Sequence, residues 1–182
     1  MPAHQQHPQS LFHEEQRVSQ AWIWIVIMAA SLLVVTIFGY GIFSQLVLDK
    51  PFGQNPMPDD VLIWFGPLMI AVGFAMPFFL RSVCLTTDVR SDGVYYQHWP
   101  VHRHPRKISL TEINTFVARQ YAPIREFGGW GIRWWGSNGW AYSVSGNRGV
   151  QFTLKNGHKI LIGSQKAEEF AAAISRYWSP TH

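Results

Sequence analysis

The chain has 182 residues, a formal net charge of +4 and one cysteine, Cys84. This length excludes two large domains, and a single cysteine excludes an internal disulfide, which fits a reducing cytoplasm. The basic excess is modest, so nucleic acid is not expected as a partner.

Residues 1–20 are rich in Gln, His and Pro and offer little to bury. We expect an N-terminal cytoplasmic tail that is disordered up to about Ser10 and then leads into the first helix. His4, His7 and His13 raise the alternative of a metal-binding tract. We favour a solvated tail, because nothing in it fixes the geometry that a metal site requires.

Two long runs without charged residues dominate the chain. No charged side chain occurs between Arg17 and Asp49, a run of 31 residues, and a second uncharged run covers residues 61–80. About 20 apolar residues in a helix cross a bilayer core, and both runs meet this length. We expect a transmembrane helical hairpin over residues 21–81, with spans at about 21–47 and 61–80.

The basic residues predict how this hairpin is oriented. The connection between the spans, residues 49–60, is a short Pro-rich turn with Lys50 as its one basic residue. Of the 15 Lys and Arg residues, only Arg17 precedes the first run, so 13 follow the second. Because basic residues are retained in the cytoplasm, we expect a multi-pass protein of the inner (plasma) membrane, with both termini cytoplasmic. Neither span contains Asp, Glu, Lys, Arg or His, which argues against a transporter or pump.

After the second span the sequence changes to a two-residue period, which is typical of strands. The dipeptides Asp92-Gly93, Asn138-Gly139 and Asn156-Gly157 mark tight turns between strands. Residues 165–178 then repeat apolar side chains every three or four positions. We expect an α+β membrane protein with a cytoplasmic domain over residues 82–182. This domain would be an antiparallel β-barrel or bent sheet of about seven strands, closed by a C-terminal helix.

The stretch from Glu126 to Ser164 reads EFGGWGIRWWGSNGWAYSVSGNRGVQFTLKNGHKILIGS, and a helix beginning QKAEEFAAAI follows it. This order resembles the bacterial pleckstrin-homology-like (PH-like) domains, and the stretch is similar to an uncharacterised group of bacterial membrane proteins that carry one. The resemblance covers residues 82–178 and implies a PH-like fold, with no catalytic residues to transfer. The turn Ser91-Asp92-Gly93 is short and acidic where lipid-binding eukaryotic domains have a long basic loop, which argues against phosphoinositide binding in that mode.

The Gly- and Trp-rich stretch 128–149 is the most unusual part of the sequence and the first place to look for a binding surface, since Trp and Arg dominate protein interfaces. The alternative is that its glycines only form turns and make room for tryptophans in the barrel core. An anion-binding nest of backbone N–H groups around residues 146–149 is a further alternative, although glycine turns are commoner. The candidate binding residues are Arg125, Trp130, Arg133, Trp134, Trp135, Trp140, Asn147 and Arg148.

A second candidate surface is the basic loop of Arg103, Arg106 and Lys107, which would attract the anionic leaflet of a membrane. A loop that is merely solvated is an equal alternative. Three histidines between positions 98 and 104 offer imidazole ligands, but no carboxylate or thiolate lies close in sequence. We therefore expect an exposed strand and loop here, and no bound metal.

No nucleophile elbow, phosphate loop, zincin helix or paired-cysteine motif occurs in the sequence. We expect a non-enzymatic membrane-anchored binding or scaffolding module without a cofactor, acting through protein contacts at the cytoplasmic face. Its expected partners are the lipid bilayer and another protein or further copies of the chain. Two alternatives stay open: an accessory subunit that contacts a larger membrane complex through its transmembrane helices, and a sensor of a small anion or ligand.

Overall fold

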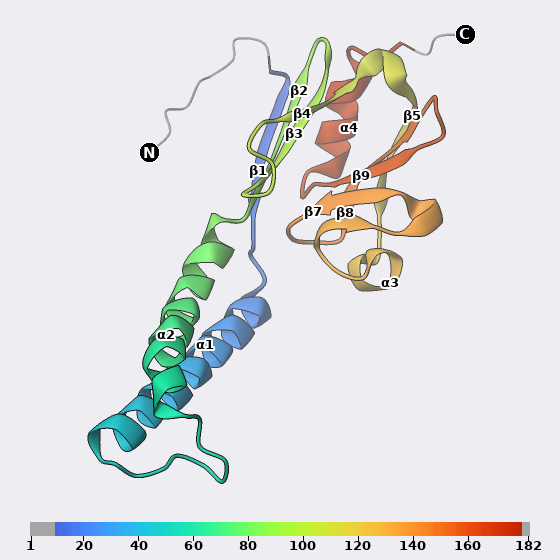
Figure 1. Ribbon diagram of the computed structural model, residues 1–182. Coiled ribbons are helices and arrows are strands. Elements are labelled where there is room, and N and C mark those ends of the chain that lie inside the picture. The colour runs from blue at the N-terminus through green and yellow to red at the C-terminus, as the bar shows by residue number, and fades with distance from the viewer. Residues whose placement is uncertain (1–9, 180–182) are drawn as a thin grey trace. The chain divides into compact units, whose positions relative to one another are not determined.

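The computed structural model describes residues 10–179 of the 182. These residues form two compact units (Figure 1). Residues 19–82 make a helical unit, and residues 10–18 together with 83–179 make a β-rich unit. The chain therefore leaves the β-rich unit after its first strand, builds the helical unit, and then returns. The overall class is α+β, as the sequence predicts.

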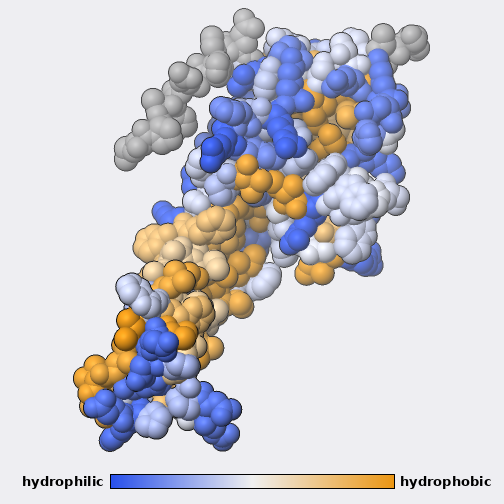
Figure 2. All heavy atoms as spheres, viewed as in Figure 1, coloured by the Kyte–Doolittle hydropathy of each residue, from blue (hydrophilic) through white to orange (hydrophobic). Residues whose placement is uncertain are grey.

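Two long apolar helices form the helical unit. α1 spans Ala21–Ile42 and continues as a π-helical stretch over Phe43–Val47, while α2 spans Asp59–Ser82. Both are long and apolar enough to cross a membrane, at the positions that the sequence predicts. Figure 2 shows apolar residues gathered over these helices.

Glycines of α2 allow the two helices to approach closely. A Cβ atom added at Gly66 would lie 2.7 Å from Cδ1 of Ile42, and one added at Gly73 would lie 2.9 Å from Cγ2 of Val35. Small residues at such contacts are typical of helices that pack within a bilayer. The helical unit is therefore a tightly packed hairpin.

A four-stranded antiparallel sheet forms one layer of the β-rich unit. Its strand order is β1-β2-β3-β4, and a tight turn at Asp92-Gly93 connects the second and third strands. A capping box between Ser109 and Glu112 then begins the 3₁₀ turn Leu110–Glu112, where the chain passes to the second sheet. The strands are β1 (Phe12–Arg17), β2 (Cys84–Arg90), β3 (Gly93–Trp99) and β4 (Arg106–Ser109).

The edge strand β1 corrects the sequence prediction. We expected a tail over residues 1–20, but β1 pairs along its whole length with β2. Phe12 is its one apolar inward residue, because the next two inward positions are Glu14 and Gln16. The alternation of apolar and polar residues that predicts a strand is therefore absent from this segment of the sequence. The folded domain is not limited to residues 82–182 but includes the segment ahead of the first helix.

A five-stranded sheet forms the second layer, with strand order β5-β8-β9-β7-β6. β7 and β9 run parallel, whereas the other neighbouring strands are antiparallel. The short helix α3 (Pro123–Phe127) and the 3₁₀ turn Gly136–Asn138 lie in its connections. The strands are β5 (Ile113–Gln120), β6 (Gly131–Trp134), β7 (Trp140–Ser143), β8 (Arg148–Leu154) and β9 (Lys159–Gly163).

The expectation of about seven strands in one antiparallel sheet or barrel is wrong. The described residues form nine strands in two sheets, and they do not close into a barrel. The β6–β7 hairpin adds to the edge of β9 in parallel, out of sequence order, and β1 adds to the far edge of the other sheet. Neither addition follows from local turn signals, which report only strands that are neighbours in the sequence.

The C-terminal helix α4 (Ala167–Ser175) completes the core, as predicted. It packs against β1, β2, β5 and β8, and Phe170 stacks on Phe12 with ring centroids 5.0 Å apart. Buried apolar side chains from both sheets and from α4 form one continuous cluster. The β-rich unit thus has its main core between two sheets and a helix, and a smaller buried cluster of Tyr121, Phe127, Ala141 and Leu161 lies apart from it.

Candidate functional site

The tryptophan-rich residues form a β-hairpin at the edge of the five-stranded sheet. β6 is the outermost strand, and Trp134 lies directly opposite Trp140 on β7. The side chains of Trp134, Trp135 and Trp140 are 62%, 52% and 45% exposed. They belong to the solvent-exposed surface and not to a barrel core. We call residues 131–143 the tryptophan hairpin.

Glycine is required where the tryptophan hairpin turns. Gly139 has a φ of +76°, and a Cβ atom added there would overlap the carbonyl oxygen of Lys159 on β9. The amide of Trp135 donates to the carbonyl oxygen of Gly139 at 3.0 Å, which closes the turn. Close packing of this turn against β9 therefore fixes the position at which the exposed indoles are presented.

Two other predicted residues, Trp130 and Arg133, hold the hairpin in place. The indole N–H of Trp130 donates to the carbonyl oxygen of Gly146 at 2.7 Å, which ties the entry of the hairpin to the turn after β7. The Nε atom of Arg133 donates to the carbonyl oxygen of Trp130 at 3.2 Å. Trp130 is thus a half-buried structural link, whereas Arg133 is exposed.

The remaining predicted residues lie outside the tryptophan hairpin. Arg125 is exposed on α3, and Asn147 is exposed in the turn before β8, where its carbonyl oxygen accepts a hydrogen bond from the Tyr121 amide at 2.8 Å. Arg148 forms an ion pair with Glu168 of α4. This ion pair engages the Arg148 side chain, whereas the nest consists of backbone N–H groups, so the anion-binding nest stays a prediction.

The three residues of the predicted basic loop differ in their positions and contacts. Lys107 lies on β4, and its Nζ atom is 2.5 Å from Oδ2 of Asp92. Hydrogen bonds from Lys107 and Tyr95 hold the pKa of Asp92 below its usual value. Arg106 donates through Nη1 to the hydroxyl oxygen of Tyr142 at 3.3 Å. Of the three predicted basic residues, only Arg103 lies in the loop itself, where it is exposed.

A buried cluster of two tyrosines and two histidines joins the sheets, and the sequence prediction missed it. Tyr96 and Tyr142 face each other with ring centroids 4.7 Å apart, and the ring of His102 lies 5.6 Å from that of Tyr142. His98 is also buried, and neither of its ring nitrogens makes a hydrogen bond of ordinary geometry within residues 10–179. The expected exposed strand and loop is therefore wrong for these two histidines.

Burial sets the protonation of this cluster. It lowers the pKa of His98, an effect that the backbone near Ser143 only partly offsets, and it raises the pKa of Tyr96. The pKa of His102 is lowered by burial and then by the nearby Arg106. The neutral rings therefore pack as part of the core. Within residues 10–179, no group of three or more His, Cys, Asp or Glu side chains is placed to hold a metal ion.

Residues 5–178 match a protein family that is described as a family of unknown function (DUF6141). The chain belongs to DUF6141. No curated protein matches it. The matched residues include both apolar helices and both sheets, so the family match spans the helical unit and the β-rich unit together.

In this DUF6141 protein, polar side chains on the inner face of β1 fix the N-terminal segment to the rest of the domain. Glu14 is buried and accepts hydrogen bonds from the Ser164 hydroxyl at 2.5 Å and from the Gln165 amide at 2.9 Å. Gln16 is buried and donates through Nε2 to the carbonyl oxygen of Gly163 at 2.7 Å. These contacts link β1 to the chain between β9 and α4, and no local pattern in the sequence indicates them.

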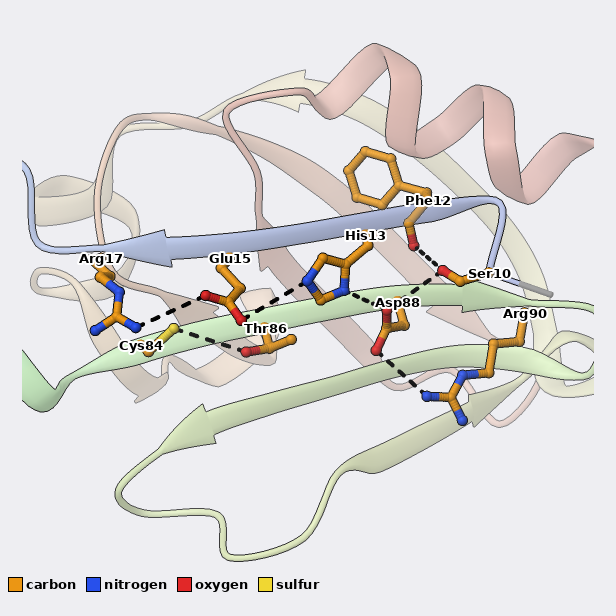
Figure 3. A network of polar contacts seen from close by, with 9 residues as sticks. All are labelled: Ser10, Phe12, His13, Glu15, Arg17, Cys84, Thr86, Asp88 and Arg90. Atoms are coloured by element: carbon orange, nitrogen blue, oxygen red, sulfur yellow. Dashed lines mark hydrogen bonds and ion pairs between the residues drawn. The ribbon is translucent and has the colours of Figure 1, made fainter. Parts of the chain in front are cut away.

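The outer face of the same sheet in the DUF6141 chain is a solvated polar network (Figure 3). Nδ1 of His13 lies 2.7 Å from Oδ1 of Asp88, and Oδ2 of Asp88 lies 3.6 Å from Nη2 of Arg90. Glu15 approaches both His13 and Arg17 at 3.9 Å. Exposed pairs of this kind contribute little to stability. His13 thus lies on a polar sheet face, while His4 and His7 of the predicted metal tract lie outside the described residues.

Proposed function

We propose that this DUF6141 protein is a non-enzymatic, membrane-anchored binding module that holds a protein partner, or a second copy of itself, at the cytoplasmic face of the inner membrane. The observation that carries the proposal is the exposure of Trp134, Trp135 and Trp140 on one hairpin. Large exposed aromatic side chains are expensive to leave in water and are enriched where proteins bind each other. Arg133, which is exposed on the same hairpin, supplies a second residue type that is common in interfaces.

Membrane anchoring is supported by the helical unit and by its connections. Large apolar side chains such as Leu32 of α1 and Phe78 of α2 are exposed, as expected for helices that face lipid. The strands on either side of the helical unit, β1 and β2, pair with each other. That pairing is possible when two spans return the chain to the side from which it started. The excess of basic residues after the second helix favours the cytoplasm as that side.

A PH-like assignment of the β-rich unit is also part of the proposal. Two packed sheets followed by a C-terminal helix support it. The parallel pairing of β7 with β9 and the origin of β1 ahead of the membrane hairpin are departures from a simple PH-like meander. The PH-like assignment therefore contributes the architecture of a binding module to the proposal, and it does not specify a ligand.

Recovery of partners from native membranes tests the proposed function. The tagged full-length chain is compared with a W134A/W140A double variant and with V117A, a control on β5, at the other edge of the same sheet, where Val117 is 55% exposed. We expect partner proteins, or an untagged second copy, to be recovered with the wild type and V117A and to be lost with W134A/W140A. Recovery that is unchanged by W134A/W140A, or a wild-type chain recovered only as a monomer, would contradict the proposal.

The second candidate, an accessory subunit that contacts a complex through its helices, is favoured by the exposed apolar surface of α1 and α2. It predicts that replacing residues 19–82 by an unrelated membrane hairpin abolishes partner recovery. The tryptophan-hairpin proposal predicts that recovery survives the same replacement. One exchange therefore separates the two candidates.

A further inference from the structure

The loop between β3 and β4 lies at the end of the sheet where the chain departs for the helical unit and returns. Arg17, the last residue of β1, pairs with Cys84, the first residue of β2. Cys84 in turn pairs with Trp99, the last residue of β3. The β3–β4 loop, which we define as residues 100–105 together with the strand end Trp99, therefore begins beside the two strand ends that connect to α1 and α2.

This loop presents an apolar and cationic surface. Trp99 is 46% exposed and Val101 is 66% exposed, although both are residues that folding normally covers. Arg103 is exposed in the same loop, and its side chain takes part in no ion pair among the described residues. Lys107 differs, because Asp92 already neutralises its charge.

The loop is held in a fixed shape from inside. The amide of His102 donates to the carbonyl oxygen of His98 at 2.8 Å, and His102 itself is buried. Nε2 of Gln97 donates to the carbonyl oxygens of His102 and Arg103 at 2.9 and 3.1 Å. With its backbone tied down in this way, the loop turns His102 inward and leaves Trp99, Val101 and Arg103 outward.

We infer that the β3–β4 loop docks on the headgroup region of an anionic bilayer. This inference rests on the proposed membrane anchoring. Three residues separate β1 from α1, and Val83 alone separates α2 from β2. Each residue spans at most about 3.6 Å, so these connections keep the strand ends within about 15 Å of the helix ends. This limit follows from the length of the connections and does not depend on how the two units are oriented. Trp is enriched at membrane interfaces, and a cationic Arg is attracted by anionic lipids.

Spin labels on the full-length chain test the inference. In a C84A background, labels are placed at V101C in the loop, at V117C on β5 and at L32C on α1. Val117 is the matched control, because it is also a valine and is 55% exposed. The protein is reconstituted into bilayers of phosphatidylcholine with or without phosphatidylglycerol, and collisions with oxygen and with a water-soluble nickel complex are compared.

We expect the V101C label to shift toward oxygen and away from nickel relative to V117C, more strongly with phosphatidylglycerol. R103A should reduce this shift, whereas K107A should leave it unchanged. A V101C label as aqueous as V117C, with L32C buried in lipid, would overturn loop docking and leave membrane anchoring intact. An aqueous L32C label would instead overturn membrane anchoring itself.

A second readout avoids replacing the buried Cys84. Brominated lipids quench the fluorescence of tryptophans at the bilayer surface, and the quenched share of the full-length protein should fall in W99F. The same share should rise slightly in W134F, because this change removes a tryptophan of the tryptophan hairpin that the lipids do not quench. Equal quenching of W99F and the wild type would contradict the inference.

Discussion

Ser164 donates its hydroxyl hydrogen to the carboxylate of Glu14 at 2.5 Å, although 150 positions separate the two residues in the sequence. The backbone amide of Gln165 donates to the other carboxylate oxygen at 2.9 Å. Glu14 belongs to the segment ahead of the first apolar helix, and Ser164 lies between the last strand and the last helix. This contact shows that the β-rich unit is built from both sides of the helical unit.

Replacing Glu14 by alanine should destabilise the β-rich unit by about 2 kcal/mol, because the buried Ser164 hydroxyl and the part-buried Gln165 amide lose their acceptor. The change is measured by chemical denaturation of the full-length chain in detergent, followed by tryptophan fluorescence. The matched control is E15A on the exposed face of the same strand, which should change the free energy of unfolding by less than about 0.5 kcal/mol. Equal effects of E14A and E15A would show that the buried contact contributes nothing.

Joining β1 directly to β2 should give a soluble folded domain. Because Arg17 and Cys84 are paired, a linker of about four Gly and Ser residues can replace residues 19–82. We expect a monomer that unfolds cooperatively, as judged by size-exclusion chromatography and circular dichroism. Residues 83–182 alone should aggregate, because they lack the Phe12 ring that covers Phe170 and leave the edge of β2 unpaired. A stable monomer from residues 83–182 alone would refute the shared domain.

The stability of the β-rich unit should fall as the pH decreases below about 6.5. Burial lowers the pKa of His98 from its ordinary value of 6.5. Just below that value the imidazole is protonated in the unfolded chain and still neutral in the folded chain, which favours unfolding. The contribution is complete above that ordinary value and is lost as the pH falls toward the pKa in the folded state. His102 shifts in the same direction.

Unfolding measured at about pH 7.5 and about pH 5.5 covers this window. H98N should show a smaller difference between the two conditions than the wild type, and H104N, at an exposed position of the same segment, should behave like the wild type. An identical pH dependence in H98N and the wild type would contradict the assignment. The contacts of Asp92 with Lys107 and Tyr95 do not contribute to this pH dependence. They lower the pKa of the Asp92 carboxylate, so this group is protonated only in stronger acid.

Alanine at Gly139 should be far more damaging than alanine at Gly157. Both glycines have positive φ, but only at Gly139 would the added Cβ overlap a backbone atom, the carbonyl oxygen of Lys159. We expect G139A to cost about 3 kcal/mol or more and G157A about 1 kcal/mol, from thermal or chemical unfolding. G139A should also reduce partner recovery, because it displaces the tryptophan hairpin. Similar losses in both variants would indicate that strain, not packing against β9, decides the effect.

The features that the sequence predicts well are those with a strong local period or a long apolar run. The apolar helices predicted at about 21–47 and 61–80 and the helix after Ser164 each depend on neighbouring residues alone, and a helix is present at each place. Strand order depends on contacts between distant residues. The parallel pairing of Trp140 with Ile160 and the pairing of Phe12 with Val89 leave no trace in local patterns.

The candidate site shows the same difference between features that the local sequence predicts and features that depend on the fold. Trp134, Trp135 and Trp140 stand out by composition, yet only the strand pairing at the sheet edge shows that they face solvent. Conversely, His98 and His102 look like loop histidines in a basic segment, while the fold places them in the core. Charge and hydropathy indicate which residue types are available, and the packing of the two sheets decides which of them are presented.

The insertion of the helical unit between β1 and β2 has a consequence for biosynthesis. The ribosome releases the first strand before either apolar helix, so that strand must wait without its partner until both helices have been made. In a membrane, a chain that inserted one helix and not the other would leave the two strands on opposite faces of the bilayer. The four-stranded sheet would then be completed only in chains that have inserted both helices.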